Sequence, residues 1–513
     1  MKRLNSFLDK HLVAVITLSA LVLFESVFLW YFSTGETLLF GDVRSRLLIA
    51  RRVFDSLTPG LTQLGAVWPP FPQMLFLPTI WNDLFFYSGL SGSLVSIASA
   101  VVATFFLAKM VLGITNSKLT TTVTALVLVF NPSFLYMATT PMTEALFISS
   151  LILSAYILWR WSVTDNIVYL PLLGVVTVAA TMTRYDGWFL AIIETLAVPV
   201  VAFIKHKSFT VARGHLFLFA TVALVGILGW FAYNQVIYGN LLRFATGEGA
   251  AAYAATQTGT SILTKGNFTH STLVYLSAIA LNVSYISLGV IFLIPFLFLL
   301  TAKRQFLLPV LIFSAPIVFN IASLFLGQSV LYTPQYQPFY FYNIRYGLLA
   351  LPLAAIGYGM VVDSLSRFLP TLKVLMVVIL LPQAVALFAN SPVTLAEARQ
   401  WYYSPKGIEQ QHLTTWLQAN RINGLTLIST LANDTLLFDT RTPLKRIIYE
   451  GSGSLWHQAT TQPSLVVQRI IVSPDIGDEV WTISLANKQF FDGYEVAFSG
   501  TYFRVYDLTN NQR

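Results

Sequence analysis

Long apolar runs separated by short polar connections constrain this chain more than any other feature. The first run, Leu12–Phe32, is about as long as a helix must be to cross a bilayer, and it is too long for the core of a signal peptide. Only 11% of the residues are charged, whereas soluble globular chains average about 25%. We therefore expect an integral membrane protein with many spans.

Eleven apolar stretches are long enough to be candidate spans. They cover residues 12–32, 92–113, 119–138, 144–161, 167–183, 187–204, 214–237, 276–301, 306–327, 346–363 and 373–390. Residues 272–303 could contain a further break. The expected fold class is therefore mainly α, a polytopic bundle of about 11 transmembrane helices.

The distribution of Lys and Arg predicts the orientation of this bundle. One side has 13 of these residues in short segments, and the other has 8 in much longer loops. Because positive charge accumulates in cytoplasmic loops, the N-terminus is predicted to lie inside and the C-terminus outside. The long segments 33–91, 239–271, 328–345 and 391–513 then all lie outside, which favours chemistry or binding at the extracytoplasmic face. The chain has no Cys, which fits a prokaryotic plasma membrane and excludes thiolate chemistry.

A change in composition near Ser391 predicts two domains. Residues 391–513 carry 21 charged residues in 123 positions, against 33 in the first 390. We expect a transmembrane domain over 1–390 and a small soluble extracytoplasmic α/β domain over 391–513. Its pattern predicts a helix at Gly407–Asn420 and strands at Leu425–Thr430, Arg446–Glu450, Arg469–Ser473, Tyr494–Phe498 and Tyr502–Asp507. This domain could be only a lid or a packing element.

The first outer loop, 33–91, is predicted to contain two interfacial helices. Apolar residues recur at helical spacing over Val43–Leu57, after Asp42 at the expected N-cap. Four arginines interrupt this pattern: Arg44, Arg46, Arg51 and Arg52. Guanidinium groups bind phosphate oxygens well, so the helix could bind a lipid phosphate, or it could lie in the interface without a specific ligand. The second apolar stretch, Gln73–Tyr87, contains Asp83.

Seven acids of the membrane domain face outward, and a base for chemistry outside would be among them. Asp42 and Glu144 are the strongest candidates, because both are expected at the outer ends of spans, where a carboxylate is costly unless it is paired, solvated or functional. Each could instead be a helix cap. Two further acids, Glu25 and Glu194, fall inside spans, where they are either deep site residues or polar contacts between helices.

Two outer connections carry further candidate binding residues. Arg184, in Thr-Arg-Tyr-Asp-Gly-Trp at 183–188, could neutralise a phosphate or simply pair with Asp186. Arg345 ends the Tyr-rich loop 332–346, whose aromatic rings could stack on sugars or form an interfacial belt. The Gly-rich segment 245–261 could order over a substrate or be a plain connection.

Taken together, these residues resemble the GT-C glycosyltransferases, polytopic enzymes that use sugars carried on polyprenyl phosphates. The chain looks most like bacterial relatives of protein O-mannosyltransferases and lipid A aminoarabinose transferases. The resemblance covers roughly residues 1–360. It depends on Asp42 after the first span, the two interfacial helices, Thr143-Glu144, the 183–188 motif and Asn343-Ile344-Arg345-Tyr346.

The resemblance implies that Asp42 deprotonates or orients the acceptor, and that arginines such as Arg184 and Arg345 lie near the lipid phosphate. Glu144 would orient the acceptor or support Asp42. The other expected substrate-binding residues are Tyr185, Asp186, Tyr346, Arg44, Arg52 and Asp83. Protein O-mannosyltransferases carry an Asp-Glu pair where this chain has Asp42-Val43, which leaves the acceptor open.

The function that we expect is therefore inverting transfer of a sugar, of the hexosyl or mannosyl type, from a polyprenyl-phosphate donor to a hydroxyl on a lipid, glycan or protein. The alternatives are a transporter or lipid flippase, and a receptor without catalytic activity. No nucleic-acid partner is expected. No metal site is predicted, because the three outward histidines His270, His412 and His457 are scattered along the chain; a divalent ion on carboxylates is compatible with the sequence but unsupported by it.

Overall fold

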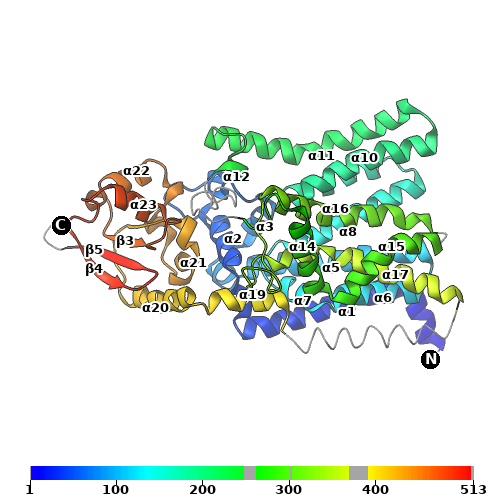
Figure 1. Cartoon of the computed structure of the whole chain (residues 1–513), viewed down its shortest axis with the longest axis horizontal. Coiled ribbons are helices and arrows are strands. Elements are labelled where there is room, and N and C mark those ends of the chain that lie inside the picture. The colour runs from blue at the N-terminus through cyan, green and yellow to red at the C-terminus, as the bar shows by residue number, and fades with distance from the viewer. Residues whose placement is uncertain (1, 248–261, 301–302, 369–390, 510–513) are drawn as a thin grey trace. The chain divides into compact units, whose positions relative to one another are not determined.

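The structure of the chain is a computed structural model that describes residues 2–247, 262–300, 303–368 and 391–509 (Figure 1). Contacts divide the chain into two compact units. The helical unit comprises Met1–Thr37, Ser93–Val236 and Leu263–Glu397. The mixed unit comprises Leu38–Gly92, Ile237–Ile262 and Ala398–Arg513. The expected division at residue 390 stays a prediction, but most of the first outer loop belongs to the same unit as the C-terminal α/β region.

The helical unit consists of long apolar helices that run along a common direction (Figure 1). Its α-helices, some of which extend beyond the unit, are α1 (Lys2–Ser33), α5 (Leu90–Thr115), α6 (Lys118–Val129), α7 (Pro132–Met137), α8 (Glu144–Thr164), α9 (Tyr169–Thr181), α10 (Asp186–His206), α11 (Phe209–Tyr238), α14 (Phe268–Val283), α15 (Tyr285–Leu300), α16 (Leu307–Leu326), α17 (Leu351–Phe368) and the start of α19 (Val393–Tyr402). Short 3-10 turns are η1 (Glu36–Leu38), η3 (Arg304–Phe306) and η4 (Ile344–Ala350).

Fewer of the described helices than the eleven expected spans have the length and apolar composition of a membrane-crossing helix. Among the described residues, seven helices are long and apolar enough to cross a membrane, or eight if α14 and α15 form one broken span. These two helices meet at an angle of 114°, so the possible break within 272–303 is present. The expected span 119–138 is divided between the 12-residue α6 and the 6-residue α7, and the expected span 167–183 contains the 13-residue α9. Each of α6 and α9 is about 20 Å or less in length at 1.5 Å per residue.

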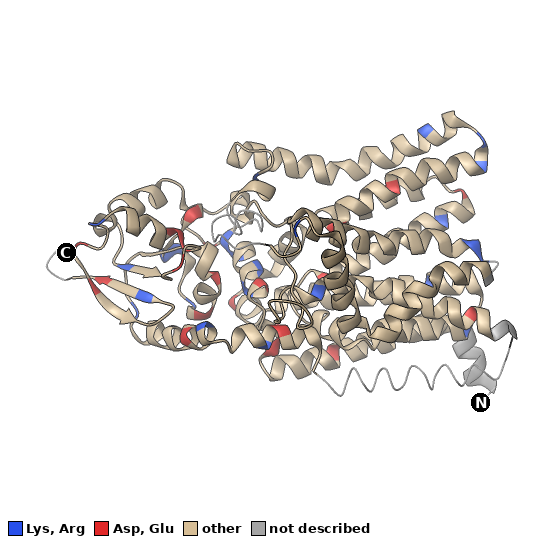
Figure 2. Cartoon of the chain, in the orientation of Figure 1, with Lys and Arg blue, Asp and Glu red and all other residues tan. Residues whose placement is uncertain are grey.

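Some expectations concern segments whose structure is not described. The expected span 373–390 lies outside the described residues, as do residues 248–261 of the Gly-rich outer segment. Figure 2 shows Lys and Arg in the connections at one end of the long helices, and few charges along the helices themselves. This pattern fits the basic-side argument, while the orientation of the chain stays a prediction.

The mixed unit contains a five-stranded sheet. Its strands are β1 (Thr426–Ile428), β2 (Ile447–Ile448), β3 (Arg469–Val472), β4 (Tyr494–Ser499) and β5 (Arg504–Leu508). The spatial order is β2-β1-β3-β5-β4. Strands β2, β1 and β3 are parallel to one another, and β5 pairs antiparallel with both of its neighbours, β3 and β4. All five strands occur where the apolar pattern predicted them. Strands β1 and β3 are buried along their whole length, as expected when helices cover both faces of a sheet.

The remaining elements of the mixed unit are short helices. From the first loop come α2 (Gly41–Arg52), α3 (Phe71–Ile80) and α4 (Asp83–Tyr87); from later segments come α12 (Arg243–Thr246), the end of α19, α20 (Pro405–Ala419), α21 (Thr430–Thr440), α22 (Ser454–Thr461) and α23 (Glu479–Ala486). The 3-10 turns are η2 (Leu61–Leu64), η5 (Leu444–Arg446), η6 (Glu450–Ser452) and η7 (Pro463–Leu465). The expected apolar segment 73–87 is split into α3 and α4, because the Asn82 side chain caps α4 by accepting the Leu84 N–H at 2.9 Å.

Helix α2 is buried to a greater extent than an interfacial helix would be. It packs against α3, η2 and α21, and its buried residues include Arg44, Arg46 and Arg52. The expectation of a helix lying in the membrane interface is therefore not met over this face. The reason is that α21 of the C-terminal region covers it, an interaction between segments nearly 400 residues apart.

Candidate functional sites

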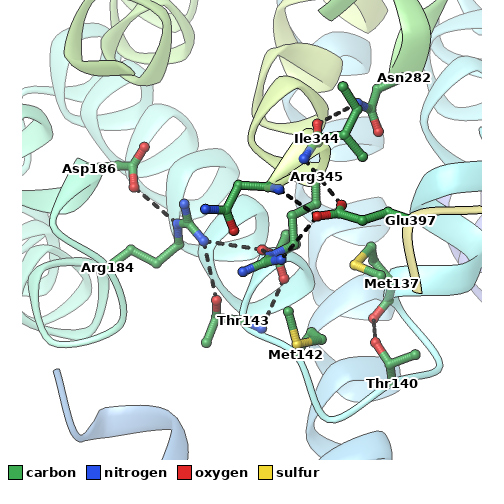
Figure 3. Close-up of polar contacts among 12 residues, drawn as sticks. Met137, Thr140, Met142, Thr143, Arg184, Asp186, Asn282, Ile344, Arg345 and Glu397 are labelled. Atoms are coloured by element: carbon green, nitrogen blue, oxygen red, sulfur yellow. Dashed lines mark hydrogen bonds and ion pairs between the residues drawn. The ribbon is translucent and has the colours of Figure 1, made fainter. Parts of the chain in front are cut away.

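A buried carboxylate, Glu144, is the centre of a cluster of charged residues in the helical unit. Figure 3 labels the other charged members, Arg184, Asp186, Arg345 and Glu397. Glu144 is the first residue of α8 and has no solvent exposure. One oxygen lies 3.1 Å from Arg184 Nη1 and 3.2 Å from Arg345 Nε. The other accepts the Thr143 N–H at 3.1 Å. The two ion pairs compensate the cost of removing this carboxylate from water.

The turn that precedes α10 positions Arg184 and Asp186 together. Arg184 Nε lies 3.0 Å from Asp186 Oδ2, and Asn320 of α16 donates to Asp186 Oδ1 at 2.7 Å. Gly187 is required here, because a Cβ at this position would collide with the backbone of Ala180. Of the two roles that the sequence allowed for Arg184, the pair with Asp186 is present.

Arg345 reaches the same cluster from η4. Its Nη1 lies 3.9 Å from Glu397 Oε1, and Glu397 also accepts backbone N–H groups of Asn343 and Ile344. Gly347 allows η4 to pack closely on α14, since a Cβ there would collide with the Ala278 carbonyl. Glu397 was not among the predicted site residues, because nothing in its local sequence distinguishes it.

The balance of charges in this cluster limits its chemistry. Two guanidinium groups lie among the three buried carboxylates Glu144, Asp186 and Glu397, so the formal charge is −1. The ring of Tyr346 lies 4.8 Å from the Arg184 guanidinium carbon and 5.4 Å from that of Arg345. A phosphate would have to compete with three carboxylates here, so the arrangement is better suited to fixing the N-terminal ends of α8 and α10 and the η4 turn than to binding an anion.

The other predicted residues of the helical unit have structural contacts as well. Tyr185 accepts a hydrogen bond from Trp230 at 3.3 Å and packs edge-on against Trp188. Glu194 accepts a hydrogen bond from Thr177 of α9 at 2.6 Å, as expected for a polar contact between helices. Glu25 is exposed on α1.

Most arginines of the first loop have partners within the mixed unit. Arg44 Nη1 lies 2.5 Å from Asp439 Oδ2. The Arg46 guanidinium stacks over Trp68 at 4.3 Å. Arg51 pairs with Asp83 at 2.6 Å, and the Asp83 side chain is 71% exposed. The expected substrate-binding residues Arg44 and Asp83 thus each take part in an ion pair.

Asp42 is half-buried in the first turn of α2. The expectation that it caps this helix is wrong: Phe40 occupies the N-cap position, and Asp42 is the second helical residue. An acid in the first turn still interacts favourably with the helix dipole. Thr143 likewise is the N-cap of α8, and Glu144 follows it.

A pocket of about 410 Å³ opens beside α2 in the mixed unit. Its wall includes Arg52, Arg243, Asp434, Tyr449 and Glu450. Glu450 follows β2, and Thr430, which also lines the pocket, follows β1 by two residues. The pocket therefore lies at the carboxyl ends of two parallel strands, the edge at which open α/β sheets bind ligands.

The charged groups of this pocket contact aromatic, hydroxyl and backbone groups, whereas those around Glu144 contact one another. The Arg52 guanidinium lies 4.7 Å from the Tyr449 ring centroid, and its buried Nε has no hydrogen-bond partner among the described residues. Burial raises the pKa of Asp434 to about 6, and the negative charge of Asp42 also raises it. A hydrogen bond from Ser45 and the positive charge of Arg52 act in the opposite direction and lower this pKa. Asp42 and Asp434 are thus near enough to interact electrostatically.

Sequence reasoning found one wall of this pocket and missed the other. Arg52 was predicted from the arginine pattern of the first loop. Asp434, Tyr449 and Glu450 were not, because the C-terminal domain was interpreted as lacking a ligand motif. One signal was available: Glu450 and Thr430 stand at the ends of two predicted strands, where polar side chains of a parallel sheet converge.

Comparison with known proteins identifies the fold. No known family model matches the chain, and no curated protein matches it. Solved structures do: ArnT from Cupriavidus metallidurans bound to undecaprenyl phosphate has a TM-score of 0.59 and 14% identity over 96% of this chain and 98% of that chain. Its apo form gives 0.57 and 15% over the same shares. An Archaeoglobus fulgidus oligosaccharyltransferase tethered to an acceptor peptide gives 0.50 and 12%, over 98% of this chain and 75% of that chain. The similarity extends through the C-terminal region, beyond the residues 1–360 of the sequence resemblance.

Proposed function

We propose that this chain, which has the fold of the GT-C glycosyltransferases, is a membrane glycosyltransferase that uses a sugar carried on a polyprenyl phosphate. The fold similarity to a transferase bound to undecaprenyl phosphate supports the donor class. The acceptor would be a hydroxyl of a lipid, glycan or protein, and the sugar a hexose such as mannose. The distribution of Lys and Arg supports a reaction at the extracytoplasmic face of a prokaryotic plasma membrane.

The observation that carries this proposal is the pocket beside α2. It offers guanidinium groups, Arg52 and Arg243, together with carboxylate, amide and aromatic side chains, which is the mixture that a sugar phosphate requires. The pocket is large enough for such a headgroup. The lipid tail needs only to approach the polar headgroup region, which accounts for placing a transferase on a membrane bundle.

In this reaction Asp42, which is not one of the residues that line the pocket but interacts electrostatically with Asp434 in its wall, acts as the general base. It accepts the proton of the acceptor hydroxyl as the oxygen attacks the anomeric carbon, and the bond between that carbon and the phosphate oxygen breaks. Polyprenyl phosphate leaves, and the configuration at the anomeric carbon is inverted. Arg52 and Arg243 stabilise the negative charge that accumulates on the phosphate. Arg184 and Arg345, also suggested for this role by sequence, lie among three carboxylates and are not assigned this role.

A transporter or lipid flippase is the alternative function. It would need a path of acids through the bundle, and the only deep acids that the sequence placed there are Glu25 and Glu194. Glu194 is hydrogen-bonded to Thr177. The pocket in the mixed unit has no role in this alternative.

The test is transfer by the purified full chain in detergent, with labelled polyprenyl-phosphate sugars and candidate acceptors, and product detection by mass spectrometry. Asp42→Asn should fold normally and lose about 10²–10⁴-fold in rate, the usual contribution of a general base. Asp475→Asn, at an exposed acid of the C-terminal region, is the matched control and should retain full activity. A wild-type rate in Asp42→Asn would remove Asp42 from the mechanism. Flux of substrate into liposomes without any sugar transfer would favour the transporter.

A further inference from the structure

Three residues with metal-binding side chains converge where α8 and α10 end and α11 begins. Asp165 directly follows α8, His206 is the last residue of α10, and His215 lies in the second turn of α11. One ligand atom from each of them lies within 4.8 Å of the other two. Asp165 and His206 are exposed to solvent, and His215 is half-buried. Sequence reasoning considered only the outward histidines and did not examine this pair.

The two histidine rings lie close together, and one of them has a backbone partner that fixes its tautomer. The His215 Nδ1 atom lies 2.8 Å from the Val211 carbonyl oxygen, which can only accept a hydrogen bond, so Nδ1 carries the proton and Nε2 keeps its lone pair. A backbone partner of this kind fixes the tautomer of many metal-binding histidines. The two imidazole rings are nearly parallel, 13° apart with centroids at 5.6 Å. His206 Nε2 lies 3.2 Å from Asp165 Oδ1.

The present partners of the Asp165 carboxylate, Lys205 and His206, can be displaced by a cation. Lys205 Nζ lies 3.1 Å from the same oxygen that contacts His206. Lysine has a long side chain on a flexible stem, so it can move into solvent when a cation binds this oxygen.

We propose that Asp165, His206 and His215 form a binding site for a divalent transition-metal ion such as Zn²⁺, with water completing the coordination. Two imidazoles and one carboxylate are a common protein ligand set for Zn²⁺, at about 2.0–2.2 Å from the ion. Ligands around a tetrahedral ion are then about 3.4 Å apart, so small side-chain rotations are sufficient. The ion would connect the ends of three helices of the bundle, α8, α10 and α11.

This site is separate from the charged cluster around Glu144: helix α10 has 21 residues, so its last residue, His206, is about 30 Å from Asp186 at its first turn. The proposed transfer assigns no role to Asp165, His206 or His215, so metal binding and transfer can be measured independently of each other.

The experiment titrates Zn²⁺ into the full chain, purified in detergent with a tag that contains no histidine, and measures stoichiometry and affinity against a competing chelator. We expect one Zn²⁺ per chain and a higher melting temperature with Zn²⁺ than with Mg²⁺. His206→Gln and His215→Gln should each weaken binding at least tenfold, since even the loss of an outer-shell partner costs about 10–100-fold. His457→Gln, elsewhere in the chain, should bind as wild type does.

Lys205→Ala gives a second and opposite test. Because Lys205 competes with the ion for Asp165, its removal should leave Zn²⁺ affinity unchanged or raise it. If neither histidine variant changes the affinity, or if the wild-type chain binds no Zn²⁺ at micromolar concentrations, the proposal is wrong and the three residues form only an ion-paired helix connection.

Discussion

The two groups of charged residues, one around Glu144 and one in the pocket beside α2, use the same residue types in different ways. Around Glu144, two arginines meet three carboxylates, and each carboxylate contacts a guanidinium or backbone N–H group. In the pocket, Arg52 has an aromatic ring as neighbour and a buried nitrogen without a partner among the described residues, while Asp434 has a raised pKa.

This difference separates a structural role from a binding role. In a network of buried ion pairs, the attraction between the charges offsets the free energy of removing them from water. A further charged ligand would add little favourable interaction with such a network. An incompletely paired guanidinium beside a carboxyl with a perturbed pKa is typical of functional sites. The arginines that the sequence motifs emphasised most, Arg184 and Arg345, belong to the first kind, and Arg52 belongs to the second.

The largest expected effect tests the structural role of the first group. Glu144→Gln removes two buried ion pairs, although Arg184 keeps Asp186 at 3.0 Å and Arg345 keeps Glu397 at 3.9 Å. Breaking a buried pair costs up to about 3–5 kcal/mol, and these remaining carboxylates reduce the loss. The melting temperature of the detergent-solubilised chain should fall by many degrees, as followed by tryptophan fluorescence or size-exclusion chromatography after heating.

The matched control is the exposed ion pair between Arg51 and Asp83. Exposed pairs contribute about 0–1 kcal/mol, so Asp83→Asn should change the melting temperature little. If Glu144→Gln melts like the wild type but loses all transfer, the group around Glu144 is catalytic rather than structural, and the contrast between the two groups fails.

Asp434 tests whether the pocket stores an unfavourable charge. A pKa raised from 3.8 to about 6 means that the folded chain binds a proton more tightly than the unfolded chain. Protonated Asp434 therefore contributes to the free energy of unfolding at about pH 4, and this contribution is lost as the pH rises through 6. The loss is at most about 3 kcal/mol. Asp434→Asn, which mimics the protonated acid, should match the wild type near pH 4 and be more stable at pH 7. Thermal melts of both proteins from pH 4 to 8 check this.

A ligand that contacts Asp434 would sharpen the same measurement. Binding of a sugar phosphate should change the pH dependence of stability in the wild type and not in Asp434→Asn. A wild-type chain that melts at the same temperature across this pH range would show that Asp434 is not buried unfavourably.

Much of the fold was predictable because it depends on local patterns. Apolar runs located the long helices, and alternation located all five strands of the sheet. The short helices α6 and α9 were mistaken for spans because hydropathy reports apolar character and not where a helix ends; Asn131 and Pro132, for example, begin a new helix, α7, shortly after α6.

The sites were predictable only in part, since each is assembled from distant segments. The motif at 183–188 gave the pair of Arg184 with Asp186, which are two residues apart. No local pattern could show that Glu397 completes the charged group around Glu144, or that Asp439 pairs with Arg44 over 395 positions. The same holds for α21, whose packing against α2 buries three arginines that were expected at a membrane surface.

The smallest expected effect distinguishes the shape of a guanidinium from its charge. Arg52→Lys keeps a cation in the pocket but removes the planar fork that binds phosphate through two hydrogen bonds. We expect the KM for the polyprenyl-phosphate donor to rise about tenfold, equivalent to roughly 1.4 kcal/mol, while kcat changes less. Arg421→Lys, at an exposed arginine of the C-terminal region, is the matched control and should leave both constants unchanged. If Arg52→Lys lowers kcat and leaves the KM unchanged, the contact between Arg52 and the phosphate forms only in the transition state. If both constants stay at wild-type values, the pocket does not bind the donor phosphate. The residues around Glu144 then become the better candidates for the binding site.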